Sequence, residues 1–264
     1  MKVSEPRNPG RSELIARGPG TARELRLLRL RLEPGEHDDL GFDGEEAAVV
    51  LLDGAVTFAW DGASHRAERE SPFRQRASAV YLPPGRSMRV DAQRSAELLI
   101  ATAACDTLGE AEFVGPERVV VNARGRGSSS REVHDILVRD VHAKRLLVGE
   151  TFNPPGHWSS FPPHKHDGED GEPYLEEVYY YRTDPAQGFG FQGLYTKDGS
   201  LDVAHVVRDG DAVLISRGFH PVAAAPGYAL YYFWVLAGEQ RELALFEDPD
   251  HVWLHGSVDD EEPS

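Results

Sequence analysis

Hydrophobic residues occur along this chain in short runs that Gly, Pro or Asp interrupts about every 8–12 residues. Val, Ile, Tyr, Phe and Trp are frequent in the runs, and hydrophobic and polar positions often alternate, which is typical of half-buried strands. The clearest runs are ELRLLRLRL, AAVVLLDGAVTFAW and AELLIATAA in the first half, and RLLVGETF, EEVYYYR, GFGFQGLYT, DAVLISRGFHPV and YALYYFWVLAG in the second. Only 21–32 could form a helix, and its last residues alternate as those of a strand do. The pattern predicts an all-β protein.

The spacing of these runs also indicates how the chain is divided. The second half repeats the first at an offset of 132 residues, so that Glu45 precedes one apolar run as Glu177 precedes another. The Gly-, Ser- and Arg-rich stretch 122–131 lies near the midpoint and is typical of a linker. We therefore expect an N-terminal arm at 1–20, β modules at 21–125 and 126–255, and an acidic tail at 256–264.

Composition then narrows the class of partner. The 264 residues include 44 Asp and Glu against 28 Lys and Arg, a net charge of −16, which argues against nucleic acid and anionic membranes as partners. The single cysteine, Cys105, excludes an internal disulfide and a thiolate metal cluster. No apolar run has the length of a signal peptide or a membrane span. We expect a cytoplasmic protein.

The candidate chemistry lies in the second half. His164 and His166 are separated by one residue, so on a strand both imidazoles project from the same face and Lys165 from the other. Because the chain has 11 histidines, about half a pair at this spacing is expected by chance, and the pair alone carries little weight. Glu177 opens a following strand, and His220 follows a turn that contains glycine. Three imidazoles and a carboxylate on neighbouring strands predict a site for a divalent transition metal.

These residues also carry a resemblance. The order HxH, Glu, GxH resembles the two motifs of the cupin superfamily, although the eleven positions from 166 to 177 exceed the common spacing and the usual proline before Arg217 is missing. The longer segments are more specific, and they resemble the 5-deoxy-glucuronate isomerase family of bacterial inositol catabolism, which is related to the uronate ketol-isomerases of pectin breakdown. These segments are GHWSSFPPHKHD, LEEVYYYR, GFGFQGLYT, SRGFHPVAAAPGYALYYFWVLAG and FEDPDHVW. The resemblance is dense over 125–255 and thinner over 20–120.

The resemblance implies a bicupin: two double-stranded β-helix (jelly-roll) barrels with the metal in the second. The offset of 132 residues agrees, because it places Leu32, Pro34, Glu45 and Met88 where the second half has its four ligands. Three of these four cannot hold a divalent ion well. We therefore expect one metal ion per chain and a first barrel without metal.

The activity that the resemblance implies is the conversion of 5-deoxy-D-glucuronate into 5-dehydro-2-deoxy-D-gluconate, an aldose–ketose isomerisation. A divalent ion held by His164, His166, Glu177 and His220 suits it, because a proton must leave the carbon beside a carbonyl while negative charge develops on oxygen. No redox step is needed, so zinc suffices, and manganese or iron would fit the same ligands.

Further residues are candidates for the remaining roles. Tyr179 and Tyr181 share the face of Glu177, and Gln192 is a polar residue between apolar neighbours, so these three are our candidate catalytic residues. For the substrate's carboxylate the candidates are Arg182 and Arg217. We expect His157 to have a structural role rather than to be a fifth ligand.

Two other classes of function stay open. A different metal-dependent cupin enzyme, either a uronate ketol-isomerase or a dioxygenase, would use the same ligands, and a non-catalytic sugar-binding bicupin would need fewer of them. The expected partner is a small sugar acid, and a homo-oligomer is compatible with the sequence.

Overall fold

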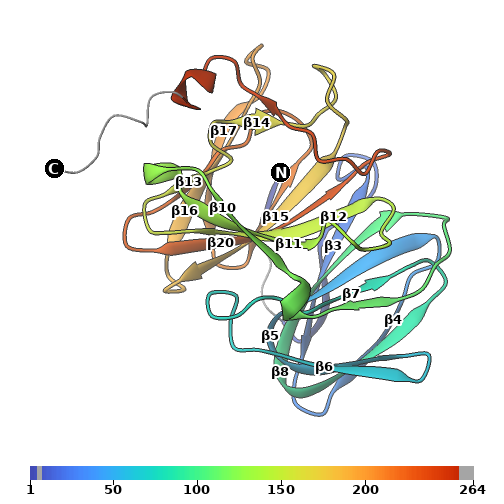
Figure 1. The fold of residues 1–264 in the computed structure, drawn as a ribbon. Helices are drawn as coiled ribbons and strands as arrows, with labels where there is room; N and C mark the ends of the chain where they lie inside the picture. Colours follow the sequence, from blue (N-terminus) through green and yellow to red (C-terminus); the bar gives the residue numbers. More distant parts are fainter. Residues whose placement is uncertain (5–7, 256–264) are drawn as a thin grey trace.

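The computed structural model describes residues 1–4 and 8–255, and the predicted acidic tail at 256–264 lies outside them. Within that range the chain is built of 21 strands and three short 3₁₀ helices, which confirms the all-β prediction. The helices are Pro116–Arg118, Gly127–Ser129 and Val252–His255. No helix of the described residues has the length and apolarity that crossing a membrane requires. The strands gather in two lobes (Figure 1).

The first lobe is built around two long antiparallel strands, β5 (Glu45–Trp60) and β8 (Ser87–Ala104). Their pairing shifts register three times between Leu51 and Val56, and such bulges bend a ladder so that each strand serves two parts of the lobe. The sheet order is β2-β3-β8-β5-β7-β9, with β4 on β8 and β6 on β5. The added strands are β2 (Gly10–Ile15), β3 (Leu25–Leu32), β4 (His37–Gly41), β6 (Ala63–Arg69), β7 (Ala79–Leu82) and β9 (Glu112–Val114).

The second lobe has a seven-stranded sheet in the order β1-β18-β15-β20-β12-β11-β10. Its strands are β1 (Lys2–Ser4), β10 (Val120–Arg124), β11 (Arg131–Leu137), β12 (Leu146–Asn153), β15 (Glu176–Asp184), β18 (Asp211–Ile215) and β20 (Ala229–Ala237). A four-stranded sheet contains β13 (Trp158–Ser159), β19 (Val222–Ala224), β16 (Phe189–Tyr195) and β17 (Asp202–Arg208). A two-stranded ribbon pairs β14 (His164–Lys165) with β21 (Phe246–Glu247).

The boundary expected at 125/126 falls inside a hairpin. β10 pairs with β11, from Val120 opposite Asp135 to Arg124 opposite Arg131, so the stretch 122–131 is sheet and turn rather than linker. The crossing from one lobe to the other occurs between β9 and β10. The N-terminal arm is divided as well, because β1 pairs with β18 of the second lobe whereas β2 joins the first. Figure 1 shows the N-terminus within the second lobe.

Strand β15 separates two environments because its side chains alternate. Val178 and Tyr180 belong to an apolar core shared by both lobes, which also contains Val50 and Leu99 of the first lobe. Tyr179 and Tyr181 face the interior of the second lobe. The apolar face of one sheet thus covers that of the other, and burial of this surface holds the lobes together.

The interior of the first lobe is apolar. Leu32 and Met88 are buried in it, together with Val49, Leu51 and Phe58. The place of Glu45 differs from our expectation. Its carboxylate pairs with Arg17 and Arg26 at the lobe's edge instead of pointing inward.

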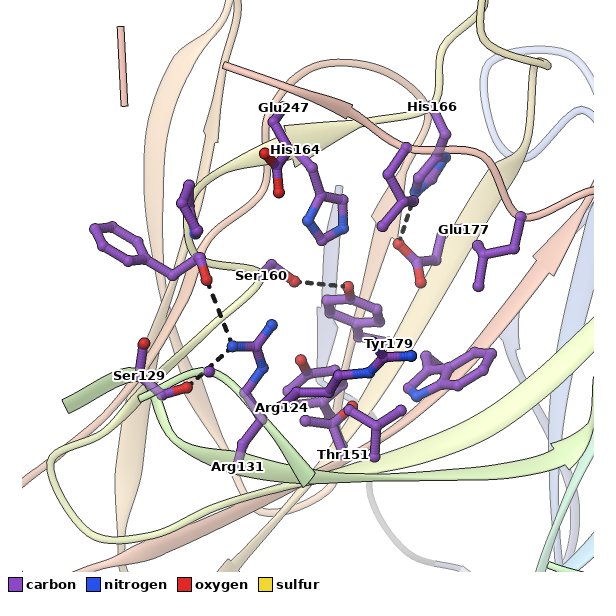
Figure 2. A pocket seen from close by; sticks show the side chains of 18 of the residues that line it. Arg124, Ser129, Arg131, Thr151, Ser160, His164, His166, Glu177, Tyr179 and Glu247 are labelled. Atoms are coloured by element: carbon purple, nitrogen blue, oxygen red, sulfur yellow. Dashed lines mark hydrogen bonds and ion pairs between the residues drawn. The ribbon is translucent and has the colours of Figure 1, made fainter. Parts of the chain in front are cut away.

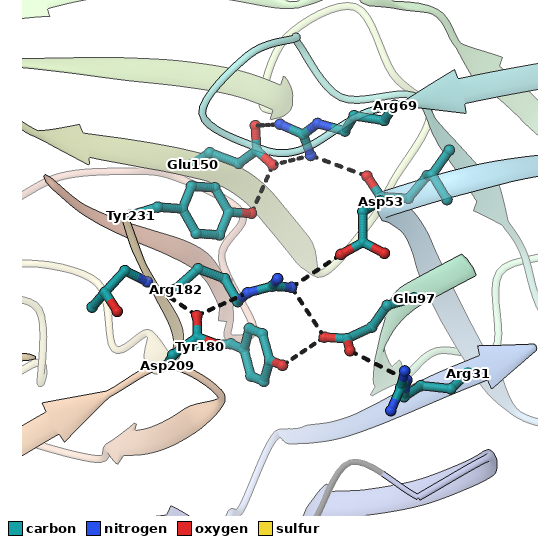
Figure 3. A network of polar contacts seen from close by, with 11 residues as sticks. Arg31, Asp53, Arg69, Glu97, Glu150, Tyr180, Arg182, Asp209 and Tyr231 are labelled. Atoms are coloured by element: carbon teal, nitrogen blue, oxygen red, sulfur yellow. Dashed lines mark hydrogen bonds and ion pairs between the residues drawn. The ribbon is translucent and has the colours of Figure 1, made fainter. Parts of the chain in front are cut away.

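Buried ion pairs complete the contact between the lobes (Figure 3). Arg69 of the first lobe forms two hydrogen bonds with Glu150 of the second, at 2.7 and 2.9 Å, and both side chains are inaccessible to solvent. Tyr231 donates a further hydrogen bond of 2.7 Å to Glu150. A buried charge that is paired in this way stabilises the native arrangement only while both partners are present.

Candidate metal centre and cavity

Three side chains from distant parts of the chain converge inside the second lobe. His166 follows β14, Glu177 lies near the start of β15, and His220 lies in the turn between β18 and β19. Nε2 of His166 is 3.1 Å from Oε2 of Glu177, and Nε2 of His220 is 3.3 Å from the same oxygen. One ligand atom from each of the three residues lies within 4.8 Å of the others, and all three residues are buried.

Backbone carbonyls orient both imidazoles. Nδ1 of His166 donates to the carbonyl of Leu175 at 2.7 Å, and Nδ1 of His220 donates to the carbonyl of Gly218 at 3.0 Å. Each bond leaves Nε2 as the nitrogen that faces Glu177, and metal-binding histidines are usually held by such a bond from the other ring nitrogen. Nε2 of His220 is buried without a hydrogen-bond partner. A buried ring nitrogen that has no hydrogen-bond partner and lies beside a carboxylate is in a suitable position to bind a cation.

The charge states also suit a cation. Burial alone would raise the pKa of Glu177, but the imidazoles of His166 and His220 lower it to about 2, so the carboxylate is ionised. Burial, reinforced by the nearby His220 and His166, holds the pKa of His164 well below its usual range. His164 is therefore a neutral imidazole, the form that binds metals.

His164 lies beside the group of three rather than inside it. Its ring centroid is 4.7 Å from that of His220 and 6.4 Å from that of His166. Lys165, between the two histidines, is buried on the other side, where its ammonium pairs with Asp167, Asp170 and Glu172. The expected alternation of this segment is thus present.

Asp167 and Gly218 connect the two segments that carry the histidines. Asp167 binds Lys165 through one oxygen and accepts a 2.9 Å hydrogen bond from the backbone N–H of Gly218 through the other. Gly218 has φ +84°, and a Cβ there would lie 2.5 Å from the carbonyl oxygen of Tyr195. Glycine is therefore required two residues before His220.

Glu176 and Glu177 point to opposite sides of β15. Glu176 accepts hydrogen bonds of 2.8 to 2.9 Å from the backbone N–H groups of Arg23, Glu24 and Leu25 in the first lobe. The predicted register of this strand is correct, since a slip of one residue would have exchanged the two glutamates.

Two members of the group of three, His166 and Glu177, border a cavity of about 900 Å³ in the second lobe. His164, His166 and Glu177 lie on its wall, and Figure 2 shows them above Tyr179, whose hydroxyl is 3.3 Å from Ser160 Oγ. Arginines from the β10–β11 hairpin form the opposite side. A volume of this order accommodates a small organic ligand.

Of the three candidate catalytic residues, Tyr179 lines the cavity, whereas Tyr181 and Gln192 are not among its lining residues. The hydroxyl of Tyr181 donates to the amide oxygen of Gln192, and the amide nitrogen of Gln192 donates to the carbonyls of Gly193, His220 and Pro221. Their polar groups are satisfied by one another and by backbone. We therefore reassign this pair from contact with substrate to support of the turn that carries His220.

Neither candidate for the substrate's carboxylate lines the cavity. Arg182 lies in the network between the lobes, where its guanidinium pairs with Asp209 at 3.0 Å, Asp53 at 3.2 Å and Glu97 at 3.4 Å (Figure 3). Arg217 is exposed and likewise lies outside the cavity wall. Two of these three carboxylates, Asp53 and Glu97, belong to the first lobe, and a pattern within β15 cannot reveal them.

Arg124 and Arg131 line the cavity and are not among the residues predicted from sequence. Both lie in the stretch that resembles a linker because of its Gly and Ser content. The available signal was three arginines within eight residues, 124–131, in a chain that is acidic overall. His157 supports this hairpin, since its Nδ1 donates to the carbonyl of Ser130 at 2.9 Å.

The fold and the buried His/Glu group define a cupin-like protein with a candidate metal centre. A model of the KduI/IolB family matches residues 10–254, so the chain belongs to the KduI/IolB family. The 5-deoxy-glucuronate isomerase of Geobacillus kaustophilus is 40% identical over 220 residues, which cover 80% of this chain and 78% of the relative. That of Bacillus subtilis is 35% identical over 216 residues, covering 80% of each chain.

Solved structures agree with this assignment. An IolB-like protein from Salmonella typhimurium superposes with a TM-score of 0.90 at 34% identity, covering 97% of this chain and 99% of that one. Oxalate decarboxylase from Bacillus subtilis superposes with a TM-score of 0.66 at 13% identity, covering 97% of this chain and 82% of the other. The second likeness concerns the fold alone.

Proposed function

We propose that this protein is a 5-deoxy-glucuronate isomerase, an enzyme that converts 5-deoxy-D-glucuronate into 5-dehydro-2-deoxy-D-gluconate. Relatives with that name are 35–40% identical over about four fifths of the chain. The observation that carries the proposal is the convergence of His166, Glu177 and His220 on one point beside a cavity. The reaction needs such a place, where negative charge on oxygen is stabilised.

We further propose a bicupin in which the second lobe alone holds metal, with His164, His166, Glu177 and His220 as ligands. Support comes from the orphaned Nε2 of His220 and from the apolar filling of the first lobe around Met88. A bound divalent ion, for which zinc is our first candidate, would polarise the carbonyl and the neighbouring hydroxyl of the sugar. The C–H group that bears this hydroxyl would thereby become more acidic.

The protein's own groups supply the remaining chemistry. Burial raises the pKa of Tyr179 well above its usual range, so the phenol stays protonated and can donate a hydrogen bond to a substrate oxygen. Ser160, 3.3 Å away, orients that hydroxyl. Glu247, opposite His164 in the β14–β21 ribbon, is a carboxylate on the cavity wall that can accept a proton from carbon.

The test is an NMR assay of the purified protein with 5-deoxy-D-glucuronate, combined with metal analysis. In deuterium oxide, the carbon that is protonated in the product should carry either deuterium from the solvent or hydrogen transferred within the substrate. Either product demonstrates isomerisation. Turnover with zinc in the absence of oxygen would exclude a dioxygenase. Turnover of hexuronates in preference to the deoxy sugar would instead assign the uronate ketol-isomerase activity, and no turnover of either substrate would overturn the proposal.

A further inference from the structure

The cavity wall opposite the histidines carries positive charge in a protein whose net charge is −16. Arg124 and Arg131 line it, and neither forms an ion pair with a carboxylate within residues 1–4 and 8–255. Most other arginines on the lobes are paired, as Arg182 and Arg69 are. Unpaired cations on a cavity wall indicate that the ligand supplies the anion.

Arg131 is the more confined of the two. It is the first residue of β11 and is partly buried, whereas Arg124 is exposed. Its Nη1 donates to the carbonyl of Ser129 at 3.0 Å and more weakly to that of Phe161 at 3.4 Å. These bonds use one terminal nitrogen, so Nε and Nη2 remain for a ligand. A guanidinium edge with two parallel N–H groups matches a carboxylate.

The turn before Arg131 is shaped to hold the guanidinium. Gly125 has φ +72°, and a Cβ at that position would lie 2.1 Å from the carbonyl oxygen of Ser129 and 2.6 Å from Nη1 of Arg131. His157 fixes the same turn through Ser130. The cation is therefore positioned before any ligand arrives, which reduces the entropy lost on binding.

Arg131 is also close to polar side chains of the cavity wall. Tyr179 and Tyr232, which line the cavity, are among its electrostatic neighbours. Figure 2 shows Arg131 across the cavity from His164, and the hydroxyls of Ser160 and Tyr179 lie at a height between the two. A chain molecule that reaches from His164 to Arg131 would pass the Tyr179 hydroxyl.

We propose that Arg131 binds the carboxylate of the sugar acid and so selects acids over neutral sugars. This inference rests on the proposed isomerase function. In 5-deoxy-glucuronate the carboxylate is at the opposite end of a six-carbon chain from the carbonyl that reacts. With the carboxylate on Arg131, the carbonyl end lies toward the histidines, and the substrate has one orientation instead of two.

The experiment compares Arg131→Gln and Arg131→Lys with wild type on two substrates, 5-deoxy-D-glucuronate and its C6 carboxamide. For Arg131→Gln we expect kcat/KM to fall about 30- to 100-fold on the acid. This factor corresponds to the loss of a hydrogen-bonded pair of opposite charges. On the amide the change should stay below about threefold, because a neutral group gains little from the cation. Arg131→Lys should recover part of the loss, since it restores charge without the paired N–H groups. Arg74→Gln, which changes an exposed arginine of the first lobe outside the cavity wall, is the matched control.

Metal content and thermal midpoint should match wild type in every variant. A loss for Arg131→Gln that is equal on acid and amide, or no loss on either, would overturn the proposal for Arg131. Absence of turnover in wild type would overturn the isomerase function instead. In that case, calorimetric titration with D-gluconate, an acid without an aldehyde or ketone group, tests carboxylate binding by Arg131 independently of turnover. Binding to wild type that Arg131→Gln abolishes would support the proposal. Equal binding by both proteins would refute it.

Discussion

Glu46 and Glu176 are reciprocal anchors between the two lobes. Each carboxylate accepts hydrogen bonds from three consecutive backbone N–H groups at the start of a strand in the other lobe. Glu176 binds residues 23–25 at the start of β3 at 2.8 to 2.9 Å, and Glu46 binds residues 144–146 at the start of β12 at 2.7 to 2.8 Å. The exchange is symmetric although the two lobes differ in sequence.

The strand registers show that the two glutamates are equivalent. Ala103 pairs with both Glu46 and Leu25, and Ala237 pairs with both Glu176 and Leu146. The repeat at this point is therefore 130 residues, two fewer than the sequence offset predicts. One residue further along, Glu177 faces the candidate metal centre, whereas Ala47 faces an apolar interior. The same framework thus carries a site in one lobe and a packed core in the other.

The adjacent glutamates should respond differently to the same substitution. Glu176→Gln should lower the free energy of unfolding by about 1–3 kcal/mol, because the single amide oxygen cannot accept hydrogen bonds from all three N–H groups. It should leave bound metal unchanged. Glu177→Gln should lose most bound metal. Urea denaturation and metal analysis of both proteins measure the two effects, with exposed Glu239→Gln as the control. Loss of metal from Glu176→Gln but not from Glu177→Gln would contradict the assignment.

His164 should prove essential for the metal centre but dispensable for the fold. We expect His164→Ala to lose metal and turnover while its strand content, measured by circular dichroism, stays as in wild type. The reason is that strand packing and the shared core hold the lobes together. Wild type stripped with a chelator should behave in the same way and recover when metal is restored. Full turnover by a metal-free variant would refute the role of this cluster.

The first lobe should contribute stability and no chemistry. Met88 is 2% exposed within its apolar core, so Met88→Ala should cost about 2–5 kcal/mol, the usual range for such a cavity. Turnover per folded molecule should not change, and the protein should hold one metal ion per chain. Metal quantification and thermal unfolding provide the check. Two ions per chain, or a stable Met88→Ala protein without activity, would reject this division.

Gly218→Ala should weaken metal binding without removing a ligand. A methyl group there would meet the Tyr195 carbonyl, and the turn that directs His220 would have to move. We expect about a 10- to 100-fold loss of metal affinity, as when groups that orient a ligand are altered. A competitive chelator titration measures it. Gly199→Ala is a suitable control, because it also has positive φ but no neighbour within 4 Å. Equal affinity in both variants would show that the turn is not constrained.

Breaking the ion pair between the lobes should destabilise the protein strongly, whereas replacing both partners by apolar residues should destabilise it much less. Arg69→Met leaves the Glu150 carboxylate buried without its counter-ion and should cost about 3–5 kcal/mol. The double variant Arg69→Met, Glu150→Met should recover a large part of that loss, since no buried charge remains. Denaturant titrations of the two singles and the double complete the cycle. A double variant less stable than the sum of the singles would contradict this account.

Local patterns were sufficient to predict the strands and the side of each strand on which a residue lies. Alternation has a period of two, so the opposite orientations of Glu176 and Glu177, and of Lys165 and its flanking histidines, follow from sequence alone. The residue types then made the His/Glu cluster recognisable. These properties depend on neighbours in the chain, which a sequence displays directly.

The tertiary structure decided which of these residues meet. Tyr181 forms a hydrogen bond with Gln192, and Arg182 pairs with carboxylates of the first lobe. The linker-like stretch folds into a hairpin that brings Arg131 to the cavity. Each of these outcomes depends on pairing between segments far apart in the chain. Such pairing is determined by the register of whole sheets and by the burial of their apolar faces, and neither can be read from the residues around any one position.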